Sequence, residues 1–173
     1  MRKTNICPWT GEWTKQYSEE AQKLKEIFKE ELVDIFHIGS TSVPTIHYAK
    51  PIIDILIVVK EIKKVDQYYK RMEELGYEPR GENGIQGRRY FPKGQLNRTH
   101  HVHIFQTGHD HIKLHLAFKN YFIQHPESAK RYGELKVALA AQFPEEHERY
   151  QQGKQRFINE VVEKLKNNED LFI

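Results

Sequence analysis

Two apolar runs, residues 33–38 and 52–59, constrain the fold of this chain more than any other feature. The first run ends in Gly39-Ser40-Thr41, where the backbone can turn tightly and open a helix. The second run is almost continuously apolar and rich in β-branched residues, which is typical of a strand buried on both faces. The pattern therefore predicts two strands of a sheet that is covered by helices.

A single acid, Asp54, interrupts the second run. A carboxylate inside an apolar strand is costly to bury unless a charged group pairs with it, and a metal ion is one such group. A Gly-Ser turn followed by an acid in the next apolar strand resembles the active-site layout of nucleotidyltransferases. That resemblance implies that the turn holds phosphate and the acid holds a divalent metal. The alternative is that Asp54 caps a loop or pairs with Lys50 or an arginine.

The rest of the pattern predicts an α/β chain. Residues 1–17 are expected to form an extended arm, with Ser18 as the N-cap of the first helix. Because no linker divides the chain, we expect one domain over 1–173, a small mixed sheet flanked by helices with a helical C-terminal part. Further strands are predicted over 88–91 and 99–106, and further helices over 63–75, 110–124, 126–142 and 144–167.

Composition excludes some classes of protein. The formal net charge of +3 is too small for a protein that coats DNA, although it is compatible with a local anionic ligand. Cys7 is the single cysteine, so no internal disulfide can form, which fits a reducing compartment. No apolar run reaches the roughly 18 residues of a membrane helix, and residues 1–4 lack a signal-peptide core. We therefore expect a cytoplasmic protein with no DNA and no membrane partner.

Several segments together resemble the GrpB family. The resemblance covers most of the chain, from about Glu19 to Val162, and implies a nucleotidyltransferase-like fold. It specifies the fold much more strongly than the activity. The matching segments are His-Ile-Gly-Ser-Thr-Ser-Val-Pro at 37–44, Ala-Lys-Pro-Ile-Ile-Asp-Ile at 49–55, Arg-Thr-His-His-Val-His at 98–103, His-Leu-Ala-Phe at 115–118, Tyr121, and His-Pro at 125–126.

Phosphate-binding candidates follow from the turn and from the basic residues. Glycine lets a backbone approach phosphate closely, and free N–H groups with hydroxyls can donate to its oxygens. The alternative for the turn is an ordinary strand-to-helix junction with a serine cap, and Lys154 could instead be a solvated lysine beside core aromatics. Arg88 and Arg89 point to opposite faces of a strand, so at most one of them can contact the phosphate. The candidates are Gly39, Ser40, Thr41, Lys50, Arg88, Arg98 and Lys154.

The metal hypothesis rests on Asp54, His101 and His103. Nucleotidyltransferases place two carboxylates at i and i+2 on one strand, but the second position here is Leu56. This departure puts a standard two-metal mechanism in doubt. His101 and His103 share one face of a strand and could replace a missing acid. Asp54 alone suits Mg²⁺, whereas Asp54 with two imidazoles suits a transition metal such as Mn²⁺ or Zn²⁺.

Three further histidines have open roles. His37 precedes the Gly-Ser turn, where it could act as a general acid or base or could hydrogen-bond the turn and hold it. His111 and His115 stand at i and i+4 on a predicted helix, a spacing that metals use, although that helix carries core residues.

These features lead to one main hypothesis and two alternatives. The main hypothesis is an enzyme that transfers a nucleotidyl or phosphoryl group to a small acceptor, with a nucleotide or other phosphorylated small molecule as ligand. The first alternative is a nucleotide- or coenzyme-binding module without catalysis, for which Leu56 is the best evidence. The second is a metal-dependent hydrolase that uses the histidine-rich face. The sequence identifies neither the acceptor nor the oligomeric state.

Overall fold

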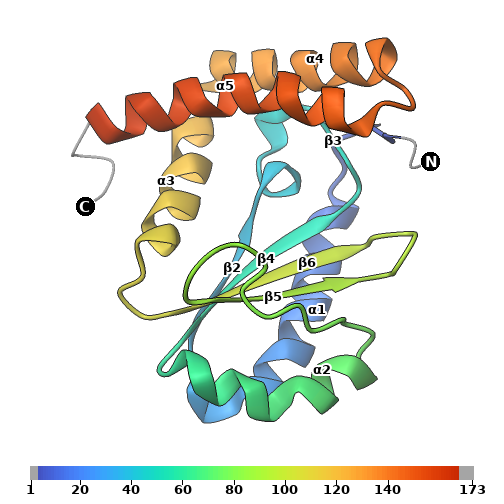
Figure 1. Ribbon diagram of the computed structural model, residues 1–173. Coiled ribbons are helices and arrows are strands. Elements are labelled where there is room, and N and C mark those ends of the chain that lie inside the picture. Colours follow the sequence, from blue (N-terminus) through green and yellow to red (C-terminus); the bar gives the residue numbers. More distant parts are fainter. Residues whose placement is uncertain (1–3, 168–173) are drawn as a thin grey trace.

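The computed structural model describes residues 4–167, which form an α/β structure around a mixed four-stranded sheet (Figure 1). The strand order is β2-β4-β6-β5. β4 runs antiparallel to β2 and parallel to β6, and β5 is antiparallel to β6. The sheet is therefore mixed, as predicted. The strand bounds are Leu32–Ile38 for β2, Ile53–Val59 for β4, Arg88–Lys93 for β5 and His100–Gln106 for β6.

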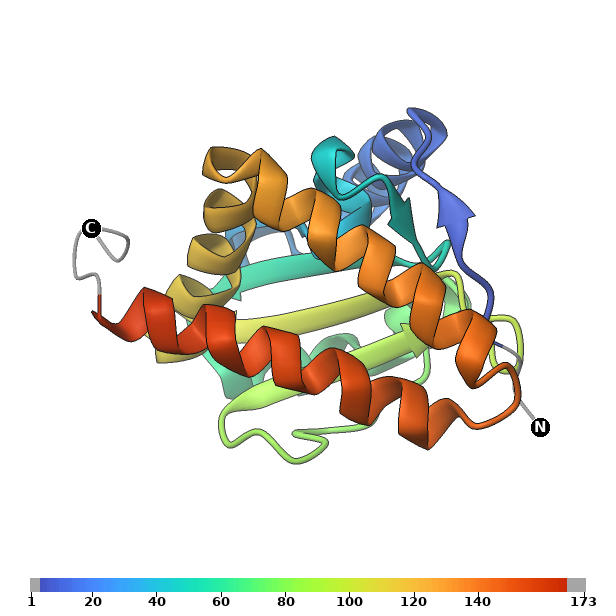
Figure 2. The same cartoon turned by 90° about the horizontal axis from the view of Figure 1, so that it is seen from above.

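Helices cover both faces of the sheet. α1 and α2 lie on one face, and α3, α4 and α5 lie on the other, where α4 and α5 cross above the strands (Figures 1 and 2). No helix of the described part of the chain is long and apolar enough to cross a bilayer. The helix bounds are Glu12–Phe28 for α1, Tyr69–Glu74 for α2, Asp110–Gln124 for α3, Pro126–Gln142 for α4 and His147–Asn167 for α5.

β4 is buried on both faces, which confirms the prediction from its β-branched sequence. Side chains at alternate positions of a strand point to opposite faces. Ile53, Ile55, Ile57 and Val59 pack into the core beneath α1 and α2. On the other face, Leu56 packs with Ile38 of β2 and Phe105 of β6. Asp54 shares that second face, which is the one that α3, α4 and α5 cover.

The segment between β2 and β4 brings α4 close to the Gly-Ser turn. It contains two 3₁₀ turns, Ser40–Ser42 (η2) and Pro44–Ile46 (η3). The short strand β3 (Tyr48–Ala49) follows and pairs with β1 (Cys7–Pro8). Gly133 of α4 lies so close to the backbone oxygen of Ile46 that a Cβ at this position would collide with it. A glycine in α4 therefore permits the helix to approach this segment.

The prediction of an extended arm over 1–17 is wrong for residues 12–17. α1 begins at Glu12, whose backbone N–H donates to the Thr10 hydroxyl at 3.3 Å. Trp13 is 4% exposed and Tyr17 packs against the same core, so these aromatic residues anchor the first turns of the helix. By local sequence, Ser18 is the better N-cap residue and favours a later helix start. Burial of the two aromatic side chains outweighs that preference. Residues 1–3 of the expected arm lie outside the described residues.

Two other helices differ from their expected bounds. Residues 62–68 form a 3₁₀ helix (η4), and α2 starts only at Tyr69. Ile62, Val65 and Tyr68 all contact the core, and a spacing of three places them on one face of a helix with 3.0 residues per turn. α5 begins at His147 rather than at Pro144.

Candidate functional site

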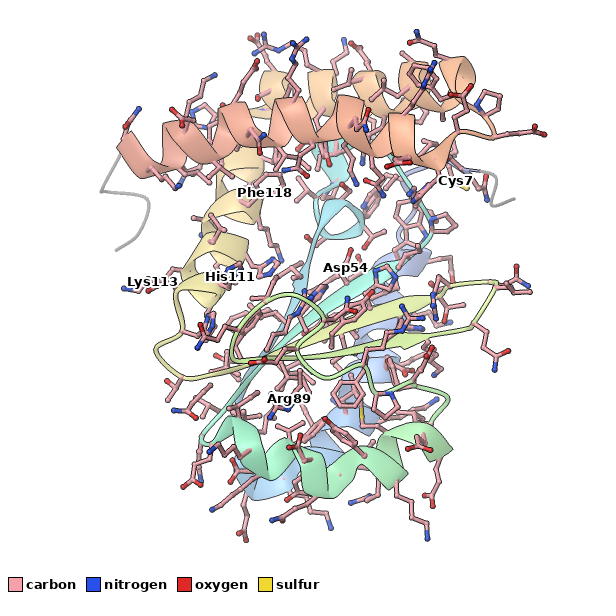
Figure 3. The ribbon with its side chains drawn as sticks, in the orientation of Figure 1. Cys7, Asp54, Arg89, His111, Lys113 and Phe118 are labelled. Carbon is pink, nitrogen blue, oxygen red and sulfur yellow. The ribbon has the colours of Figure 1, made fainter. Side chains whose placement is uncertain are left out.

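Asp54 lies at the centre of the candidate site. It pairs with Ile38 of β2 on one side and with His101 of β6 on the other. Its side chain, 30% exposed, occupies the sheet face beneath α4 and α5 (Figure 3). The Gly-Ser turn follows Ile38 directly, so strand pairing alone brings the turn and the acid together.

His101 and His103 both turn toward Asp54, as their predicted shared face requires. His101 Nδ1 lies 3.5 Å and His103 Nε2 lies 3.4 Å from Asp54 Oδ1. Burial raises the pKa of Asp54, but the hydrogen bonds from the two imidazoles outweigh it and hold the pKa well below the usual range. The Asp54 carboxylate is therefore ionised at neutral pH.

Arg88 fixes the orientation of His103. Its Nη1 lies 3.4 Å from His103 Nδ1, and because a guanidinium can only donate, Nδ1 accepts and Nε2 carries the proton that faces Asp54. Arg88 also donates to the backbone oxygens of Glu82 and Asn83, at 3.1 and 2.7 Å. The Arg88 guanidinium thus binds the loop at residues 82–83 and His103. Both ring nitrogens of His103 have hydrogen-bond partners, Arg88 and Asp54.

The prediction that Arg88 and Arg89 face opposite sides of β5 is confirmed. Arg89 lies on the side of the sheet that faces α2 (Figure 3), where its Nε contacts Asp66 Oδ1 at 2.7 Å. Arg89 is therefore remote from Asp54, and of the two arginines only Arg88 reaches the histidine face.

A cavity of about 160 Å³, called here the lysine pocket, adjoins Asp54. Three lysines and a single acid line it, so its lining carries a net positive charge. The structure brings six of the predicted residues together at this cavity, and these are Ser40, Thr41, Lys50, Asp54, His101 and Lys154.

Lys136 of α4 is the third lysine of this pocket, and the sequence reading missed it. Its side chain is 3% exposed and its Nζ donates to Ser40 Oγ at 2.8 Å. Burial, reinforced by the nearby charges of Lys154 and Lys50, lowers the pKa of Lys136 to about 7. The available signal was its helical spacing from Tyr132 and Leu139, which places a lysine on the buried stripe of α4.

Tyr150 of α5 completes the wall of the lysine pocket. The residue is fully buried, and its hydroxyl has no hydrogen-bond partner within residues 4–167. Burial raises the pKa of this hydroxyl to about 12, so it keeps its proton and can donate to an anion. The Nζ atoms of Lys50 and Lys154 lie 4.7 and 5.8 Å from the centre of its ring.

His37 lies behind the turn and does not line the pocket. Its Nε2 is 2.9 Å from the Thr41 hydroxyl, its ring stacks on Tyr17, and its backbone oxygen accepts from Lys119 Nζ at 2.7 Å. Burial, reinforced by the Lys119 charge, lowers the pKa of His37 to about 4. Of the two roles that the sequence left open, this geometry favours holding the turn in place.

The metal hypothesis for Asp54, His101 and His103 stays a prediction. In the described part of the chain, no group of three or more His, Cys, Asp or Glu residues is arranged to hold a metal ion. The two ring nitrogens of His103 are already engaged, so it offers no lone pair to a metal in this arrangement. Asp54 remains the residue that could hold an ion together with oxygens of a ligand. On α3, the His115 ring lies 5.4 Å from the ring of His103 in β6, and the His111 ring lies 6.3 Å from that of His115.

Comparison with known proteins places this chain in a family. The sequence model of the GrpB protein family matches residues 3–164. The chain is 47% identical over 165 residues to the protein YqkA of Bacillus subtilis. The match covers 95% of this chain and 48% of YqkA, so the chain spans about half the length of that relative. It superimposes on the crystal structure of GrpB from Enterococcus faecalis with a TM-score of 0.81 and 42% identity, covering 91% of this chain and 99% of that one.

A more distant likeness identifies the wider fold class. A cytoplasmic RNA terminal U-transferase matches 75% of this chain and 41% of its own, with a TM-score of 0.50 and 11% identity. The fold is therefore nucleotidyltransferase-like, as the Gly-Ser turn and the strand acid predict. Because the family model spans nearly all of the described residues, and a solved member shares their structure, the chain belongs to the GrpB family.

Proposed function

We propose that the lysine pocket binds the phosphate end of a nucleotide or another phosphorylated small molecule, from which a nucleotidyl or phosphoryl group passes to a small acceptor. The observation that supports this proposal is the convergence of Lys50, Lys136 and Lys154 on one small cavity beside the ionised Asp54. The net positive charge of the pocket favours an anion, and the hydroxyls of Ser40 and Tyr150 add neutral donors.

The size of the pocket argues for phosphate rather than a whole nucleotide inside it. Sites for drug-sized ligands have volumes of about 300–1,000 Å³, whereas the lysine pocket measures about 160 Å³. One or two phosphate groups would fill it, with the rest of the molecule outside. In a phosphate transfer the protein mainly positions the groups and balances charge, which is what lysines and hydroxyls can do.

Asp54 has a role that suits its low pKa. An acid that stays ionised is a poor proton acceptor, so Asp54 contributes negative charge rather than general-base catalysis. Asp54 would hold a divalent ion such as Mg²⁺, and the ion would neutralise charge on the transferring group. His103, which Arg88 orients, contacts the carboxylate. Fold likeness to an RNA terminal U-transferase supports this reaction class by analogy.

Pyrophosphate binding tests the phosphate site directly. We expect calorimetric titration to show binding, and Lys136→Met to weaken it about tenfold or more because a buried charge-assisted hydrogen bond is lost. Lys130→Met on the exposed side of α4 is the control and should leave affinity unchanged. Since an anion raises the pKa of Lys136 from about 7, titration at pH 8 should also take up more protons in the wild type than in Lys136→Met. Absence of binding at millimolar pyrophosphate would rule out the proposal.

A second candidate is a binding module without turnover, and one observation favours it. The position of a second carboxylate is occupied by Leu56, which is fully buried against Ile38 and Phe105. Nucleoside triphosphates with Mg²⁺ or Mn²⁺ and a pool of small acceptors separate the two candidates. A transferase releases pyrophosphate or a nucleoside diphosphate, and Asp54→Asn loses this release while pyrophosphate still binds. A binding module binds the nucleotide in both proteins and releases nothing.

A further inference from the structure

A second cavity continues from the lysine pocket. It measures about 490 Å³ and is called here the Arg98 pocket. It lies between the connection of β5 to β6 and the start of α5, which share one end of the molecule (Figure 1). Both cavities are lined by Lys50, Ile52, His101 and Gln151, so they form one cleft with two compartments.

The volumes of the two compartments suit different ligands. The lysine pocket is smaller than the sites that hold whole small molecules, whereas about 490 Å³ lies inside the usual range of about 300–1,000 Å³. A complete small molecule therefore fits the Arg98 pocket while phosphate occupies its neighbour.

The charge of the Arg98 pocket calls for an anion. No Asp or Glu of the described chain lines it, and its fixed charges are those of Lys50 and Arg98. His147 at the start of the 21-residue helix α5 also lines it, and the positive end of the helix dipole favours negative charge there. Arg98 Nη1 is buried, yet it has no hydrogen-bond partner among residues 4–167. An unpaired buried donor is unfavourable, so the protein would favour an anionic ligand that pairs with Arg98.

The remaining walls disfavour a nucleobase. Nucleobases bind best by stacking on the large rings of Phe, Tyr and Trp; none of these lines this cavity among the described residues, and its rings are the smaller imidazoles of His101 and His147. Its apolar surface comes from aliphatic side chains, among them Leu96, which is 88% exposed at the rim. This combination suits an aliphatic molecule with a carboxylate or a phosphate ester.

We propose that the Arg98 pocket binds the acceptor, a small aliphatic anion whose carboxylate or phosphate group pairs with Arg98. The inference rests on the proposed function, because it places this molecule beside a phosphate held by Lys136 and Lys154. Arg98, which the sequence grouped with the phosphate-binding residues, becomes the residue that selects the acceptor.

Amide NMR spectra of the labelled protein test the inference. Inorganic pyrophosphate is first added to saturation, and then either succinate or glycerol 3-phosphate is titrated, so that the carboxylate and phosphate sources are distinguished. We expect pyrophosphate to shift the amides of Ser40 and Thr41, and one of the two probes to shift those of residues 96–99. Arg98→Met should weaken binding of that probe at least about tenfold with pyrophosphate affinity unchanged, and the exposed Arg156→Met should change neither.

The outcomes separate the two proposals. If pyrophosphate binds but neither probe shifts residues 96–99, or if Arg98→Met leaves probe affinity unchanged, the acceptor site is refuted and the phosphate site stands. If pyrophosphate does not bind, the proposed function fails, and the acceptor site falls with it.

Discussion

The backbone of Gly39 lies directly against the carboxylate of Asp54. Gly39 has a φ of +72°, and a Cβ placed on it would stand 2.7 Å from Asp54 Oδ2 and 3.2 Å from Asp54 Cβ. Two separate constraints therefore require glycine at this position, a left-handed backbone conformation and the close approach of an acid. The Gly-Ser turn, which would hold phosphate, and Asp54 therefore pack directly against each other.

Replacement of Gly39 should disturb both the turn and the acid. The backbone conformation alone costs a residue with a Cβ about 1–3 kcal/mol. Gly108 has a φ of +89° with nothing within 4 Å of its Cβ position, so Gly108→Ala measures that cost by itself. We expect Gly39→Ala to lower the free energy of unfolding by clearly more than Gly108→Ala, as measured by urea denaturation. The excess should shrink in an Asp54→Ala background, and equal losses at the two glycines would show that the contact is unimportant.

The burial of Lys136 should cost stability at neutral pH. Its pKa of about 7 in the folded protein lies below that of an unfolded lysine, about 10.4, so the unfolded chain binds more protons between these values. Stability should therefore rise as pH increases from about 7 to 10, and Lys136→Met should remove that rise. We expect this variant to be more stable by about 1–3 kcal/mol at pH 6–7, as measured by thermal unfolding.

The control for this effect is Lys130→Met, because Lys130 is 62% exposed on the same helix. It should unfold like the wild type at every pH. A Lys136→Met protein that is less stable than the wild type at pH 6 would show that the bond to Ser40 outweighs the cost of burying the charge.

Two buried histidines should make the protein sensitive to acid. The pKa values of His37 and His115 are each lowered to about 4, in both cases mainly by burial. Because the unfolded chain binds more protons between about pH 6.5 and 4, stability should fall as the pH decreases through this window. His115 Nε2 is buried without a partner in the described structure, so His115→Leu should reduce the acid-induced loss by about 1–2 kcal/mol at pH 5.

His47→Asn provides the comparison, because His47 is exposed and asparagine tolerates its φ of 70°. Chemical denaturation at pH 7 and pH 5 gives the acid-induced loss for each protein. His47→Asn should lose as much stability between pH 7 and pH 5 as the wild type. If His115→Leu loses that much too, the titration of His115 does not contribute to the acid sensitivity.

A buried polar contact joins α1 to the edge of the sheet. Glu20 is 5% exposed, and its Oε1 accepts from the Tyr77 hydroxyl and from Lys93 Nζ, each at 2.8 Å. Glu20→Ala leaves both donors without this acceptor, so we expect a loss of about 2–4 kcal/mol in urea denaturation. Glu19→Ala, at the exposed neighbouring position, should change stability by less than about 0.5 kcal/mol. Similar losses of stability in the two variants would mean that the contacts of Glu20 with Tyr77 and Lys93 do not stabilise the fold.

Local patterning was sufficient for the four strands of the main sheet and for one face of the site, but not for β1 and β3. The β-branched run identified β4, and the period of two placed His101 with His103 and separated Arg88 from Arg89. These properties depend on neighbours in the chain, because steric preference and alternation act over a few residues. The chain therefore determined by itself which side chains share a face of each strand, and the pairing of β4 with β2 and β6 brings Asp54 together with the turn and the two imidazoles.

Only the tertiary structure decided which charged groups complete that site. Lys136 contacts Ser40 across 96 positions of sequence, and it does so because Gly133 lets α4 approach η3. The start of α1 was likewise set by the burial of Trp13, against the local preference for a cap at Ser18. In both cases, packing between distant segments outweighs local propensity, because the free energy of burying a side chain depends on what covers it.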